Sequence, residues 1–71
     1  MNVEDTRIEI QDLRSGTIIG WIEYEDGEFY ASSDEIFDIV KFYRDNGADD
    51  QYVISVLSSW SNGLQRAYVV S

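Results

Sequence analysis

The fold is decided by residues 32–47, which read SSDEIFDIVKFYRDNG. Apolar residues recur through this stretch at helical spacing, at Ile36, Ile39, Val40 and Tyr43. At its start, Ser32 followed by Glu35 predicts a capping box. At its end, Gly47 predicts a helix stop with a left-handed residue. The stretch therefore predicts one amphipathic helix whose apolar face covers another element.

Three strands are predicted before this helix, because apolar and polar residues alternate along the chain. They span residues 6–12, 17–25 and 28–31. Asp26-Gly27 predicts a two-residue hairpin, since a type I′ turn needs positive φ values. That hairpin sets Tyr24 opposite Phe29. The three strands together predict an antiparallel meander.

The length of the first turn determines which side chains of the meander share a face. A two-residue loop would set Ile8 opposite Glu23, whereas a three-residue loop with Gly16 in the left-handed conformation sets Ile8 opposite Ile22. The longer loop unites the isoleucines on one face, and we favour it. Simple alternation along the second strand then also places Ile18 on the core face.

Two more elements are predicted after the central helix. A second helix is expected from Asp50 to about Ser61, capped by Asp49 or Asp50, with Val53, Val56, Leu57 and Trp60 as its apolar stripe. Residues 52–56 would also make a respectable strand, and the helix stop at Asn62-Gly63-Leu64 decides for the helix. Residues 65–70 predict a closing strand, antiparallel to either edge of the meander.

The expected fold is a two-layer α+β domain that includes all 71 residues, in the order β-β-β-α-α-β. The 44% of hydrophobic residues are enough for a packed core. No apolar run approaches the ~20 residues of a membrane span, and residues 1–5 lack the features of a signal peptide. We therefore expect a cytoplasmic or virion-associated protein that is not secreted by a signal peptide.

Charge is the most unusual property of the composition. Fourteen acidic and five basic residues give a formal net charge of −9. Binding to phosphate backbones or anionic membranes needs cations, so we expect no direct nucleic-acid or membrane partner. Two origins of the acidity stay open: adaptation to concentrated salt, which screens self-repulsion, and the ordinary acidity of a mesophilic protein.

The residue inventory argues against catalysis. The chain contains no His and no Cys, which excludes the usual nucleophilic triads and thiolate or imidazole metal sites. Residues 45–50 have the composition of a calcium loop, but counting back from Gly47 puts Phe42 at the first ligand position, so the EF-hand spacing fails. We expect a non-enzymatic protein without a metal or cofactor.

Three apolar side chains, Trp21, Tyr30 and Ile19, are predicted on the sheet face away from the helix. They could be covered by the N-terminal segment, be partly exposed without a role, or form a contact surface. Exposed aromatic residues beside carboxylates are typical of protein-recognition surfaces. The first hypothesis is therefore a protein–protein interaction module, within a larger assembly such as a viral particle or with a second copy as partner.

The alternative hypothesis is an acidic inhibitor that mimics nucleic acid and blocks a DNA- or RNA-binding protein. Its surface would be formed by carboxylates that imitate spaced phosphates: Glu23, Glu25, Glu28, Asp34 and Asp38. A mimic should gather its carboxylates on one face, whereas salt adaptation should spread them over the whole surface.

Overall fold

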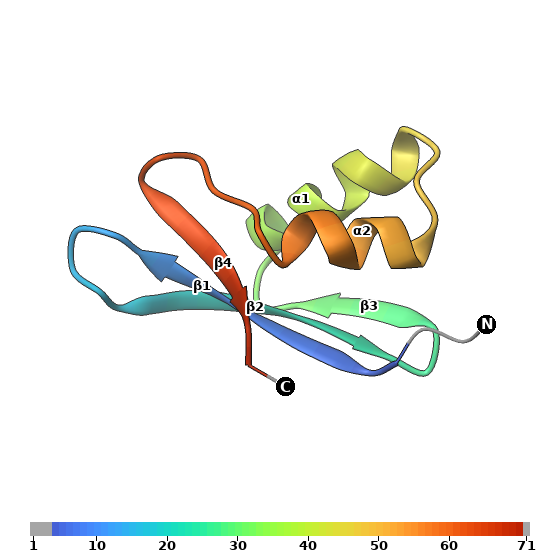
Figure 1. The fold of residues 1–71 in the computed structure, drawn as a ribbon, viewed down its shortest axis with the longest axis horizontal. Helices are drawn as coiled ribbons and strands as arrows, with labels where there is room; N and C mark the ends of the chain where they lie inside the picture. The colour runs from blue at the N-terminus through green and yellow to red at the C-terminus, as the bar shows by residue number, and fades with distance from the viewer. Residues whose placement is uncertain (1–3, 71) are drawn as a thin grey trace.

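The computed structural model describes residues 4–70, which form a four-stranded antiparallel sheet with two helices (Figure 1). The element order is β1 (Thr6–Asp12), β2 (Ile18–Glu25), β3 (Glu28–Ala31), α1 (Asp34–Asp45), α2 (Asp50–Leu57) and β4 (Gln65–Val69). Both helices lie on one face of the sheet. The predicted two-layer α+β architecture is confirmed.

The sheet has the strand order β3-β2-β1-β4, so β1 lies inside the sheet between β2 and β4. Gly16 adopts a φ of 74°, and Ile8 lies opposite Ile22, as predicted. The loop is one residue longer than predicted, because the Asp12 N–H donates to the Thr17 carbonyl and leaves residues 13–16 as the loop. The Asp26-Gly27 turn also has positive φ values, and Tyr24 lies opposite Phe29. Both predicted registers are confirmed. Of the two edges left open for the closing strand, β4 occupies the one formed by β1.

The predicted core position of Ile18 is wrong, because β2 contains a bulge. Ile10 lies opposite Gly20, but the next residue of β1, Gln11, lies opposite Ile18, so Ile19 is the extra residue. Residues directly opposite each other share a face of the sheet. The bulge therefore moves Ile18 to the face of Gln11, where 40% of its surface is exposed.

Helix α1 begins one residue later than the predicted capping box requires. Ser33, not Ser32, is the N-cap, and its Oγ accepts a hydrogen bond from the backbone N–H of Ile36. Ser32 remains paired with β2: its backbone N–H donates to the Trp21 carbonyl, and its Oγ accepts from the Trp21 N–H at 3.0 Å. Because the chain turns into α1 here, this Oγ takes the place of a ladder carbonyl. At the other end Gly47 adopts a φ of 88°, as predicted.

Helix α2 resolves the ambiguity of residues 52–56, which are helical. Asp49 caps it by accepting a hydrogen bond from the Tyr52 N–H at 2.8 Å. The helix ends at Leu57 rather than near Ser61, so Trp60 is not part of its stripe, although Trp60 still packs against the core.

The core lies between the helices and one sheet face. Six side chains are almost fully buried there: Ile8, Ile10, Ile22, Val40, Val53 and Leu57. Gly20 faces the start of α1, where a β-carbon would lie 2.8 Å from Ser32 Oγ. Among the described residues, neither helix is long and apolar enough to cross a membrane.

Candidate functional site

The candidate site is the sheet face opposite the helices, here called the outer face, which no other described element covers (Figure 1). Strand registers assign its residues, because side chains alternate between the two faces. Across β1, β2, β3 and β4 these are Arg7, Glu9, Gln11, Trp21, Glu23, Glu25, Glu28, Tyr30, Arg66 and Tyr68, together with Ile18 beside the bulge.

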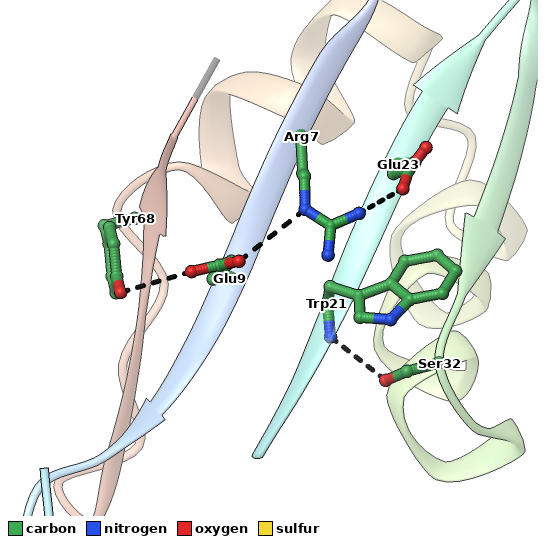
Figure 2. Close-up of polar contacts among 6 residues, drawn as sticks. All are labelled: Arg7, Glu9, Trp21, Glu23, Ser32 and Tyr68. Atoms are coloured by element: carbon green, nitrogen blue, oxygen red, sulfur yellow. Dashed lines mark hydrogen bonds and ion pairs between the residues drawn. The ribbon is translucent and has the colours of Figure 1, made fainter. Parts of the chain in front are cut away.

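Arg7 organises the centre of this face. Its guanidinium donates a hydrogen bond to Glu23 on the neighbouring strand and forms an ion pair with Glu9 at 3.6 Å (Figure 2). Tyr68 on β4 donates its hydroxyl to the same Glu9 at 3.4 Å. One network therefore crosses three strands, and in it one guanidinium pairs with two carboxylates.

Trp21 lies in the same region. The Arg7 guanidinium carbon is 5.1 Å from the centroid of its ring, within the range of a cation–π contact. The Trp21 backbone is held by Ser32, as described above. The side chain is half-buried, so Arg7 orients the indole while part of its surface stays accessible. The first account given above was that the N-terminal segment covers these side chains. Residues 1–3 of that segment lie outside the described residues.

Tyr30 and Ile19 are more exposed than Trp21. Tyr30 lies on β3 opposite Glu23, with 51% of its surface exposed, and Ile19 is 44% exposed at the bulge. The structure thus places two of the three predicted anchors on the outer face by register, and Ile19 beside them in β2. Sequence analysis did not predict that Ile18 lies on the outer face. The signal in the sequence was the pair of adjacent isoleucines, because strict alternation would place only one apolar residue there.

The edges of the sheet are less accessible than its outer face. Beyond β4, Ser61 bridges to Arg66, the Asn62 N–H donates to the Gln65 carbonyl, and the Ala67 N–H donates to the Trp60 carbonyl. The opposite edge, β3, has only four residues. Covered or short edges are the usual protection against unwanted strand addition. The outer face is therefore the better-exposed surface for a partner.

The carboxylates of the alternative hypothesis lie on two layers. Glu23, Glu25 and Glu28 belong to the outer face, whereas Asp34 and Asp38 lie on α1, which covers the opposite face. Glu23 is moreover paired with Arg7. The structure does not bring the five residues together on one face.

The helical layer contains a surface hollow of about 500 Å³ at the turn between α1 and α2. It is lined by Tyr43, Asn46, Gly47, Ala48, Asp49 and Tyr52. Asp49 serves as the cap of α2, and Gly47 as the stop of α1. Within residues 4–70 no group of three or more acidic side chains is arranged to hold a metal ion.

One polar contact ties the two layers together. Tyr24 on β2 donates its hydroxyl to Asp50 Oδ2 at the start of α2, at a distance of 2.8 Å. This hydrogen bond raises the pKa of Tyr24 above its ordinary value of 10.0, and burial of the ring raises it further. The contact fixes the start of α2 against β2.

Comparisons with protein-family models, with curated proteins and with solved structures find no match for this chain. The functional argument therefore depends on the geometry of the outer face.

Proposed function

We propose that this chain is a non-enzymatic protein–protein interaction module that docks through its outer face, with Trp21, Tyr30 and Ile19 as anchors. In this role it is a subunit of a larger assembly. The observation that carries the proposal is an uncovered sheet face on which aromatic and aliphatic side chains are exposed.

The charge arrangement supports the same conclusion. Fully buried charges are costly at an interface unless they are paired. Arg7 is paired with both Glu9 and Glu23 before any partner arrives, so a partner that covers the centre of the face does not bury an unpaired guanidinium. Trp21 and Tyr30 are of the residue type that contributes most to binding energy at interfaces.

The experiment is capture of binding proteins from an extract of the source cells by the immobilised chain, with quantitative mass spectrometry. Trp21→Ala and Tyr30→Ala remove anchors from the outer face. Phe42→Ala is the matched control, because Phe42 is an aromatic residue on α1 with 63% of its surface exposed. All variants are first checked for folding by circular dichroism.

We expect proteins that the wild-type chain and Phe42→Ala retain but that both outer-face variants lose. Equal capture by all four proteins would show that the outer face is not the docking surface.

A further inference from the structure

The outer face has opposite charges at two diagonally opposite corners. On β3, the edge strand at one side, Glu28 lies opposite Glu25, level with the beginning of β1. On β4, the edge strand at the other side, Arg66 lies opposite Gln11, near the end of β1. Figure 1 shows the β2–β3 hairpin and the start of β4 at opposite ends of the sheet.

At the acidic corner, two neighbouring carboxylates repel each other. Glu25 and Glu28 are direct cross-strand neighbours on one face, and like charges in that position destabilise a sheet. Within residues 4–70 no Lys or Arg forms an ion pair with either carboxylate. Local rules are broken chiefly at functional or strained sites, and a cation from a partner would compensate these two carboxylates.

The basic corner supplies such a group. Arg66 is exposed and forms no ion pair within residues 4–70. Its guanidinium carbon lies 5.4 Å from the centroid of the Tyr68 ring, which belongs to the outer face. This contact holds the charge over the face rather than away from it.

We propose that the outer face binds the outer face of a second copy of this chain, so that the Glu25–Glu28 corner of each copy meets Arg66 of the other. A two-fold axis that lies in the plane of the interface exchanges two opposite corners, and both copies then make the same contacts. The apolar anchors and the paired network around Arg7 lie between the corners. This inference rests on the proposed docking function and names the partner.

The size of the face indicates which class of interface it can form. The four strands contain 7, 8, 4 and 5 residues. At about 3.3 Å per residue and about 4.8 Å between strands, they give roughly 400 Å² per copy. A total of roughly 800 Å² is below the standard size of specific interfaces and in the range of weak, transient encounters. The association is therefore weak and needs a high protein concentration to be detected.

The experiment is sedimentation equilibrium of the full chain in 0.15 M NaCl, up to about 1 mM protein. Glu28→Lys reverses the acidic corner and Arg66→Glu the basic one. Their matched controls lie on α1: Asp38→Lys changes the net charge by the same amount as Glu28→Lys, and Lys41→Glu by the same amount as Arg66→Glu. Each variant is also checked for its fold by circular dichroism.

We expect each corner variant alone to dimerise at least about tenfold more weakly than its control. An equimolar mixture of Glu28→Lys and Arg66→Glu should associate again, because a mixed dimer pairs Lys with Glu at one corner and Arg66 with Glu28 at the other. A variant that loses its fold would also fail to associate in the mixture, and circular dichroism identifies that case. The test is then made with the milder variants Glu28→Gln and Arg66→Gln. Their dimers should be weaker than those of the controls Asp38→Asn and Lys41→Gln.

The proposal of a second copy is overturned if the wild-type chain stays monomeric at 1 mM. It is also overturned if the control variants weaken the dimer as much as the corner variants do. Neither result touches the capture experiment, in which face-dependent binding of a different protein would still support the docking function. Self-association and the docking function can therefore fail separately.

Discussion

At the scale of single residues, the two neighbouring serines that precede α1 have different hydrogen-bonding roles. Ser33 caps the helix and Ser32 completes the hydrogen bonding of β2. Either serine satisfies the composition of a cap, so local sequence does not choose between them. The roles are determined by the Trp21 N–H, eleven residues before Ser32. This N–H needs an acceptor where the chain leaves β3, and Ser32 Oγ supplies it, so Ser33 is left to cap the helix.

We expect Ser33→Ala to destabilise the protein by about 1 kcal/mol, the usual cost of a lost N-cap. Ser33→Asp should retain the stability, because a carboxylate both caps and favours the positive end of the helix dipole. Urea denaturation followed by circular dichroism measures both. Equal stability of Ser33→Ala and the wild type would mean that another residue caps α1.

Gly20 is required for a steric reason rather than for an unusual φ value. A β-carbon at this position would lie 3.1 Å from Ile36 Cγ1 as well as 2.8 Å from Ser32 Oγ. Gly20→Ala should therefore push α1 away from β2 and cost about 1–3 kcal/mol. The measurement is the urea midpoint, and an unchanged midpoint would show that Ser32 and Ile36 can move at no cost.

At the scale of elements, α2 is short and depends on its packing. It has eight residues, fewer than an isolated helix needs in water, and buries Val53 and Leu57 completely. The helix is therefore held by the core rather than by its own propensity. Tertiary contact also explains why residues rich in β-branched side chains are helical here.

Leu57→Ala should cost about 2–5 kcal/mol, because it removes a fully buried side chain and leaves a cavity. Such a loss is comparable to the whole stability of a domain of this size. Tyr52→Ala, on the exposed side of the same helix, should change stability by less than about 0.5 kcal/mol. Thermal denaturation compares the two variants, and similar losses would contradict the docking of α2 through Leu57.

The Tyr24–Asp50 contact between sheet and helix predicts a dependence on alkaline pH. The folded state raises the pKa of Tyr24, so the unfolded chain releases this proton first. The stabilisation is complete below pH 10.0 and is lost as the pH rises through the higher pKa of the folded state. Tyr24→Phe should remove this part of the alkaline destabilisation, and Tyr52→Phe should not. Urea midpoints at pH 8 and pH 11 test the difference.

The elements also show which features a sequence can predict. The Asp26-Gly27 turn and the pairing of Ile8 with Ile22 followed from local turn chemistry and from alternation. The bulge did not, because Ile18 and Ile19 are both apolar and alternation cannot tell which one is extra. Trp21 and Tyr30 lie on the sheet face that alternation predicted for them. The network of Arg7 was not predicted, since its partners are defined only when three strands are in register.

At the scale of the whole molecule, the acidity is distributed unevenly. The β2–β3 hairpin and the α1–α2 turn lie towards the same end of the sheet, and both are rich in carboxylates. These acids are Glu25, Asp26, Glu28, Asp45, Asp49 and Asp50. Repulsion within this end opposes folding at low ionic strength, where the screening length is greatest.

We expect the thermal midpoint to rise between 10 mM and 1 M NaCl, because salt screens this repulsion. Asp45→Asn combined with Asp26→Asn should reduce the rise, since both changes remove charge from the crowded end. Differential scanning calorimetry measures the midpoints. A midpoint independent of salt would count against both the repulsion and the hypothesis of a halophilic origin.

The position of β1 in the sheet has a consequence for the order of folding during synthesis. β1 is made first, but its second neighbour is β4, more than fifty residues later in the chain. Until residues 65–69 emerge from the ribosome, one side of β1 has no strand to pair with. The nascent chain therefore passes through a stage in which β1 is an open edge strand, and the β4 of another chain can pair with it before its own β4 does.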